Sequence, residues 1–112
     1  MRLLSPRFVQ AFPGKILNIH PSLLPAFPGL DAQKQALEYG VKVTGCTVHF
    51  VDQGIDSGAI IAQATVGVFP EDTPARLHER IQAAERTLYP QVIGAMAQGK
   101  VSVRGRQTVW AA

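Results

Sequence analysis

The segment from residue 16 to residue 29 constrains the fold most, because a short apolar run leads directly into three prolines and a glycine. The apolar run predicts a strand that ends at Pro21. Residues two apart in a strand point to the same face, so Asn18 and His20 are expected to project side by side. The prolines then fix the path of the chain without a helix. The sequence therefore predicts an amide and an imidazole on one surface, beside a rigid loop.

An Asn-x-His pair alone is more often structural than catalytic, but the whole segment from Asn18 to Gly29 carries more information. It resembles the Asn-x-His-Pro-Ser-Leu-Leu-Pro signature of the formyltransferases that use 10-formyltetrahydrofolate. The continuation from Phe27 to Leu30 is similar to the phosphoribosylglycinamide formyltransferase branch. Methionyl-tRNA formyltransferases tend to have an Arg-Gly-Ala-type continuation instead, and formyltetrahydrofolate hydrolases tend to have a second His where this chain has Pro21. The resemblance covers residues 1 to about 93.

Length and composition restrict the number of domains and the classes of function. With 112 residues and 46% hydrophobic residues, the chain fits one compact domain. The net charge of +3 comes from scattered basic residues, which argues against a nucleic-acid-binding stripe. A single cysteine, Cys46, rules out an internal disulfide and a cysteine metal knuckle. No apolar run is long enough to span a membrane and no signal core follows Met1, so a soluble cytoplasmic protein is expected.

The order of predicted elements indicates an α/β fold. Periodicity and turn residues predict helices over 5–12, 31–39 and 74–98, an antiparallel pair of strands over 45–52 and 59–68, and a last short strand over 101–103. The resemblance implies the C-terminal part of a formyltransferase-type Rossmann-like fold, with a mixed sheet and a long C-terminal helix. Residues 1–112 are then one catalytic and folate-binding domain, incomplete at its N-terminus.

Two predicted strands frame a loop over residues 52–58 that contains two glycines and two aspartates. By itself this pattern predicts only a turn. The resemblance identifies it with the family's folate-binding loop and Asp56 with the essential aspartate. The implied folate contacts are Arg2, Leu3, Leu4, Asn18, Asp52, Gln53, Gly54, Ile55 and Asp56. His49 could support this site, but a half-buried structural histidine is the preferred interpretation, and Cys46 is expected to be a small buried hydrophobe.

The long helix predicted over 74–98 carries a pair of polar residues. Gln82 and Glu85 are three apart and share a helix face. A solvated surface is the simplest interpretation of this pair. The resemblance instead implies that Gln82, Ala83, Ala84 and Glu85 contact glycinamide ribonucleotide.

Asn18, His20 and Asp56 together have the chemistry that formyl transfer needs. The tetrahedral intermediate carries negative charge on oxygen, which an Asn amide and a protonated His can stabilise. The imidazolium can also act as general acid, and a nearby carboxylate favours the protonated ring. The expected function is transfer of a formyl group from 10-formyltetrahydrofolate to the amine of glycinamide ribonucleotide in purine biosynthesis, with no metal. Alternatives are a deformylase, a methionyl-tRNA formyltransferase or a non-catalytic remnant.

The sequence contains no glycine-rich strand-to-helix turn that could hold the ribonucleotide phosphate. The resemblance implies that such a turn belongs to a half that precedes residue 1. The strand over 17–20 should then be an exposed edge. The isolated chain is therefore expected to bind the missing half in trans, to form a homodimer or to be inactive alone.

Overall fold

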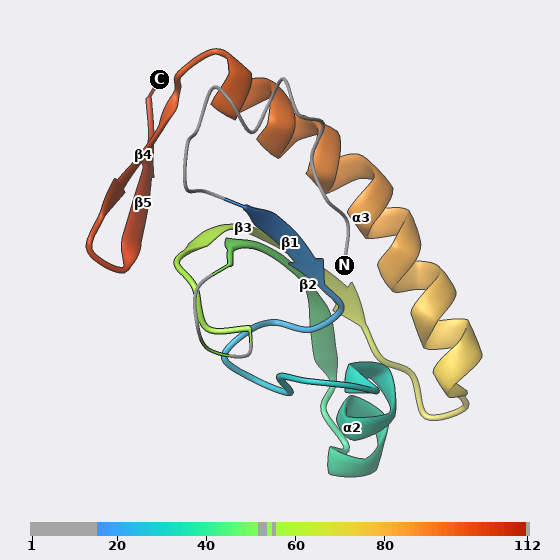
Figure 1. The fold of residues 1–112 in the computed structure, drawn as a ribbon. Helices are drawn as coiled ribbons and strands as arrows, with labels where there is room; N and C mark the ends of the chain where they lie inside the picture. Colours follow the sequence, from blue (N-terminus) through green and yellow to red (C-terminus); the bar gives the residue numbers. More distant parts are fainter. Residues whose placement is uncertain (1–15, 52–53, 55, 112) are drawn as a thin grey trace.

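The computed structural model describes residues 16–51, 54 and 56–111. A three-stranded sheet lies against a long helix, with a short helix and a two-stranded hairpin at opposite ends (Figure 1). The elements in chain order are β1 (Leu17–His20), α2 (Ala32–Tyr39), β2 (Val43–Phe50), β3 (Ile60–Gly67), α3 (Pro74–Ala97), β4 (Val101–Arg104) and β5 (Gln107–Trp110). The α/β prediction and its long C-terminal helix are confirmed. The helix predicted over 5–12 lies outside the described residues.

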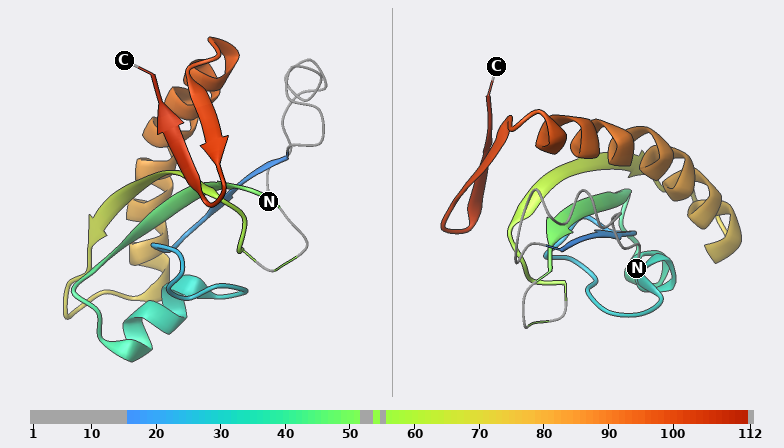
Figure 2. Two further views of the ribbon diagram at one scale, coloured as in Figure 1. Left: turned by 90° about the vertical axis from the view of Figure 1, so that its left-hand side faces the viewer. Right: turned by 45° about the horizontal axis from the view of Figure 1, so that its top comes forward.

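The main sheet has the order β1-β2-β3, and both neighbouring pairs are antiparallel. His20 is opposite Thr47 and Asn18 is opposite His49, so these four side chains lie on one face. Among the described strands β1 lies at an edge, as the sequence predicted. The chain segment over 21–31 covers the polar face, and α3 covers the other face (Figure 2).

Helix α3 closes the apolar core. Thr73 caps its N-terminus by accepting a hydrogen bond from the Arg76 amide, and Pro74 occupies the first turn, both as predicted. Its inward residues pack against alternate residues of β1 and β2, among them Leu17, Ile19, Cys46, Val48, Leu77, Ile81 and Val92. Because the α3 side of the sheet is apolar, the polar chemistry of β1 and β2 is confined to the opposite side.

Helix α2 matches its predicted span, but the Asp31 side chain does not cap it as predicted. Asp31 is the N-cap residue, yet its side chain makes no capping hydrogen bond because its backbone is left-handed, with φ 55°. Gly40 ends the helix with φ 86°, as the sequence indicated. No helix in the described residues is long and apolar enough to cross a bilayer.

Strand β2 runs from Val43 to Phe50, two residues earlier than predicted, and seven of its residues are buried. Gly45 is required inside this strand because a Cβ atom there would lie 1.9 Å from the carbonyl oxygen of Ala64. The strand is therefore packed on both faces.

The C-terminal hairpin is more extensive than predicted. Strand β4 matches the strand predicted over 101–103, and the sequence analysis missed β5. A two-residue turn of Gly105 and Arg106 joins the strands, with φ 63° at Gly105. Trp110, which had no assigned role, donates from its indole nitrogen to the carbonyl oxygen of Ile61 at 3.0 Å. The hairpin is thereby attached to the start of β3.

Candidate active site

His20 and Asp56 meet on the polar face of the sheet. The Nδ1 atom of His20 lies 3.3 Å from Oδ2 of Asp56, and both side chains are nearly buried. His20 comes from the end of β1, and Asp56 from the connection between β2 and β3. The structure therefore brings together two of the three predicted catalytic residues from separate segments.

The second ring nitrogen of His20 faces another oxygen. Its Nε2 atom lies 2.8 Å from the carbonyl oxygen of Phe27. A neutral imidazole has a hydrogen on only one nitrogen, whereas the imidazolium has one on each. An ionised Asp56 and the Phe27 carbonyl are both acceptors, so the imidazolium form of His20 can donate to both.

Asn18 lies two residues before His20 on the same face of β1. Its Oδ1 atom accepts a hydrogen bond of 2.9 Å from the Ile19 amide. This contact fixes the side-chain oxygen and turns the amide nitrogen away from the Ile19 backbone. The third predicted catalytic residue therefore lies on the face of β1 that carries His20, and its amide group can supply a neutral donor.

Asp56 is also held by the proline-rich loop. The Gly29 amide donates to its Oδ2 atom at 2.8 Å, which joins the carboxylate to the end of the proline-rich loop. Its backbone has φ 51°, a conformation that a residue with a Cβ atom adopts at a cost. The end of the loop over 21–29 is therefore joined directly to the Asp56 carboxylate.

His49 is more closely involved than the preferred sequence interpretation allowed. It is 1% exposed, and its Nε2 atom lies 3.6 Å from Oδ1 of Asp56. Its Nδ1 atom lies 2.9 Å from the Phe50 carbonyl oxygen and donates to it. The side chain is fully buried and not half-buried as predicted, and its contact with Asp56 agrees with the alternative that His49 supports the site. Two imidazoles thus flank the Asp56 carboxylate.

The proline-rich loop is anchored by Thr47, which the sequence analysis did not select. Its Oγ1 atom donates to the Ser22 carbonyl oxygen at 2.7 Å and accepts from the Leu24 amide at 3.1 Å. The amide of Gln63 also donates to Thr47 Oγ1 at 3.0 Å, and to the Leu24 carbonyl oxygen at 3.0 Å. The available signal was a polar residue two positions before His49, on the same face of the predicted strand.

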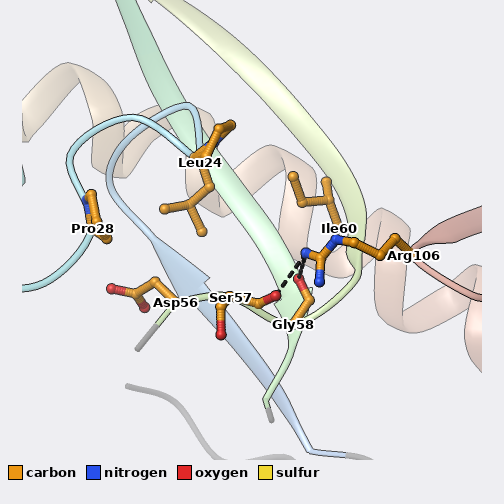
Figure 3. Close-up of a pocket in the computed structure, with 8 residues that line it drawn as sticks. Leu24, Pro28, Asp56, Ser57, Gly58, Ile60 and Arg106 are labelled. Carbon is orange, nitrogen blue, oxygen red and sulfur yellow. Dashed lines mark hydrogen bonds between the residues drawn. The ribbon is translucent and has the colours of Figure 1, made fainter. Parts of the chain in front are cut away.

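An open pocket of about 470 Å³ borders this site (Figure 3). Leu24, Pro25, Pro28 and Ile60 provide apolar walls, and Asp56, Ser57, Gly58 and Arg106 provide polar groups. This size is within the range of pockets that bind small molecules. Asp56 lines the pocket directly, whereas His20, 5% exposed, lies behind the carboxylate.

The remaining predicted folate contacts are only partly described. Arg2, Leu3, Leu4, Asp52, Gln53 and Ile55 lie outside the described residues. Gly54 is described and exposed. Within the described part of the chain, no cluster of His, Cys, Asp and Glu could hold a metal ion.

The predicted ribonucleotide contacts lie on α3, across the sheet from Asp56. Gln82 and Ala84 are half-buried and Ala83 is exposed. Glu85 is only 7% exposed, so its interpretation as a solvated surface residue is wrong. Burial raises the pKa of the Cys46 thiol to about 11, and the Glu85 carboxylate adds to this increase. Cys46 is the buried, unreactive residue that the sequence predicted.

Comparisons with known proteins agree with this geometry. Residues 1–93 match the formyl transferase family. Phosphoribosylglycinamide formyltransferase from Mycobacterium tuberculosis is 52% identical over 106 residues, which cover 95% of this chain and 49% of that protein. The crystal structure of glycinamide ribonucleotide transformylase 1 from Symbiobacterium toebii has a TM-score of 0.88 and 54% identity, and covers all of this chain and 53% of that one.

A third relative belongs to a different enzyme of the same fold. The formyltetrahydrofolate deformylase of Pseudomonas syringae has a TM-score of 0.85 at 30% identity, and covers all of this chain and 38% of that one. The chain spans about half the length of the Mycobacterium tuberculosis relative. The matched segment contains Asn18, His20 and Asp56. The chain therefore belongs to the formyl transferase family.

Proposed function

We propose that this chain is the catalytic part of an enzyme that transfers a formyl group from 10-formyltetrahydrofolate to the amine of glycinamide ribonucleotide, a step of purine biosynthesis. The observation that carries the proposal is the 3.3 Å contact between His20 and Asp56, within a sequence 52% identical to a phosphoribosylglycinamide formyltransferase. Both substrates are small molecules of the cytoplasm, and the proposal involves neither nucleic acid nor membrane.

The reaction begins when the amine nitrogen attacks the formyl carbon. A new C–N bond forms, and the formyl oxygen becomes an oxyanion. The Asn18 amide and the His20 imidazolium donate to this oxyanion and thereby stabilise it. For His20 to reach the substrate, its Nε2 proton must leave the Phe27 carbonyl oxygen, 2.8 Å away in the structure.

Breakdown of the intermediate needs two proton movements. The attacking amine loses a proton, which Asp56 accepts directly or through water. The bond between the formyl carbon and N10 of the folate then breaks, and His20 gives a proton to N10 as general acid. Asp56 keeps His20 oriented through the 3.3 Å contact between its Oδ2 atom and the Nδ1 atom of His20. The chemistry uses no metal ion.

For the folate we propose a site beside Asp56, formed by the loop over residues 52–56 together with Arg2, Leu3, Leu4 and Asn18. The pocket bordered by Asp56 supports this assignment through its size and its apolar walls. A flat heteroaromatic ring suits such walls and would exchange hydrogen bonds with backbone groups of the loop.

For glycinamide ribonucleotide we propose contacts with residues 82–85 of α3. Gln82 and Glu85 are the polar candidates among them, because an amide and a carboxylate can form hydrogen bonds with the hydroxyl groups of a ribonucleotide. The phosphate of this substrate requires a separate anion site. We propose that the rest of the enzyme supplies it, either in the same polypeptide or in trans, and that a homodimer is the alternative partner.

The deformylase and the methionyl-tRNA formyltransferase are the enzymatic alternatives. Identity to the deformylase is 30%, against 54% to the Symbiobacterium toebii transformylase, and this difference favours the ribonucleotide as acceptor. A non-catalytic remnant is the alternative from a different class.

The test joins this chain to the N-terminal half of the Mycobacterium tuberculosis relative and supplies 10-formyltetrahydrofolate. Formylation of glycinamide ribonucleotide, formate release and formylation of initiator Met-tRNA are measured separately. We expect transfer to the ribonucleotide to dominate. Dominant formate release or tRNA formylation would overturn the proposed acceptor. Loss of all three activities together with absence of folate binding would support the non-catalytic alternative.

A further inference from the structure

The C-terminal hairpin is tied to the segment that follows Asp56. The Nη2 atom of Arg106 donates to the Ser57 carbonyl oxygen at 2.7 Å and lies 3.4 Å from the Gly58 carbonyl oxygen. Two further side chains of β5 donate to the start of β3: Thr108 to Ile60 at 2.7 Å and Trp110 to Ile61 at 3.0 Å. Three donors on one hairpin thus hold the carbonyl oxygens of one short segment.

The donors of these contacts lie in a part of the chain that the match to the family model does not reach. The match ends at residue 93, whereas the hairpin begins at Val101. Figure 3 shows the Arg106 guanidinium beside Ser57, Gly58 and Ile60, in the pocket that Asp56 also lines. The hairpin therefore forms one wall of the site, although it lies more than 40 residues further along the chain.

We propose that Arg106 is a positioning residue for the Asp56 carboxylate. It acts through the carbonyl groups one and two residues after Asp56, and the Gly29 amide holds the carboxylate from the opposite direction at 2.8 Å. The importance of this role for the reaction rests on the proposed function of Asp56. The positioning itself depends only on the contacts described.

Two physical features make this arrangement effective. Asp56 has φ 51°, so its backbone needs support from its neighbours to remain in that conformation. A guanidinium is a charged, planar donor, and it bonds carbonyl oxygens more strongly than a neutral group does. Loss of the guanidinium would let the segment over 56–58 move and carry the carboxylate away from Gly29 and His20.

The test compares three variants of the chain: Arg106→Met, Arg106→Lys and Arg104→Met. Arg104 is the matched control, because it lies on the same exposed hairpin but does not line the pocket. The readout is hydrogen exchange of the Gly29 amide by NMR, relative to the Val48 amide within the sheet. Because Gly29 donates to Asp56, its exchange reports the position of the carboxylate without requiring any catalysis.

We expect Arg106→Met to speed Gly29 exchange about tenfold relative to Val48, since one charge-assisted hydrogen bond is lost. Arg106→Lys should speed Gly29 exchange by a smaller factor, and Arg104→Met should leave the ratio of the Gly29 to the Val48 exchange rate unchanged. Gly29 exchange that stays within about twofold in Arg106→Met would overturn the proposal. An equal effect in Arg104→Met would also overturn it, because the cause would then be net charge.

A second measurement separates this inference from the proposed function. In the joined enzyme, Arg106→Met should lower kcat for formyl transfer about tenfold with less change in KM, because the group displaced is a catalytic one. If the Gly29 effect is found but no formyl transfer occurs in any form of the enzyme, the positioning role stands and the proposed function fails. If transfer occurs and Arg106→Met changes neither kcat nor Gly29 exchange, the positioning role fails alone.

Discussion

Replacing Thr47 by valine should loosen the whole loop that covers His20. The hydroxyl of Thr47 makes three hydrogen bonds, to Ser22, Leu24 and Gln63, at 2.7, 3.1 and 3.0 Å. The residue is fully buried. Valine has nearly the same shape, so the substitution removes the hydrogen bonds and leaves no cavity.

The loss in free energy of unfolding can be estimated from the groups that lose a hydrogen-bond partner. The Leu24 amide and the Ser22 carbonyl are backbone groups, and the Leu24 amide bond is buried. An unsatisfied buried group costs about 1–3 kcal/mol. The Gln63 amide keeps its hydrogen bond to the Leu24 carbonyl oxygen, so losing its bond to Thr47 costs little stability. We therefore expect Thr47→Val to lower the free energy of unfolding by about 2–4 kcal/mol.

Urea denaturation followed by circular dichroism measures this change as a lower midpoint with an unchanged m value. Two controls define the cause. Thr47→Ser keeps the hydroxyl and should lose only about 1 kcal/mol, from the missing methyl group. Thr65→Val, on the exposed side of β3, should change stability by less than about 0.5 kcal/mol. A loss below about 1 kcal/mol for Thr47→Val, or an equal loss for Thr47→Ser, would refute the reasoning.

Three further predictions concern the rest of the chain. The Arg80 hydrogen bond lowers the pKa of Asp72 from 3.8 to about 2. The stability gained from this ion pair is therefore complete above pH 4 and is lost as the pH falls towards 2. The free energies of unfolding of the wild type and of Asp72→Asn, measured as a function of pH, should converge there. Cys46, with its pKa raised to about 11 and no exposure, should react with a disulfide reagent at pH 8 only after unfolding, and reaction in the native state would contradict its burial. Gly45→Ala should destabilise the protein by more than about 2 kcal/mol in thermal unfolding, because its Cβ would collide with the Ala64 carbonyl, and an unchanged Tm would show that β2 and β3 can separate there.

Local signals in the sequence predicted most of the fold. The strand at 17–20 was bounded by a proline, α2 by Asp31 and Gly40, and the start of α3 by Thr73. Each boundary depends on residues within a few positions of it, which is why pattern analysis located it. The Asp31 side chain was the exception, since its left-handed backbone turns it away from the helix amides.

Contacts between distant segments could not be predicted in the same way. The environment of His49 depends on Asp56, seven residues later, and on the register of β2 with β1. The three bonds of Thr47 reach residues 16 to 25 positions away. Glu85 has a polar side chain on a helix, and only the packing of α3 on β2 shows that it is buried. Sequence periodicity assigns a residue to a face but does not say what covers that face.

The pairing of His20 with Asp56 could be expected only from the family signature, because the two residues are 36 positions apart and in different segments. The role of Arg106 had no such signal. It lies in a hairpin of which only the first strand was predicted, after residue 93, where the match to the family model ends.

The central claim is that His20 and Asp56 act as one catalytic unit. The most direct test is a double-mutant cycle on the single-turnover rate of formyl transfer to glycinamide ribonucleotide, in the chain joined to its N-terminal half. Each of His20→Ala and Asp56→Asn should slow the reaction about 10²–10⁴-fold, and the double variant should be no more than about tenfold slower than the slower single one. Independent effects that multiply in the double variant, or a His20→Ala enzyme that keeps its full rate, would contradict the claim.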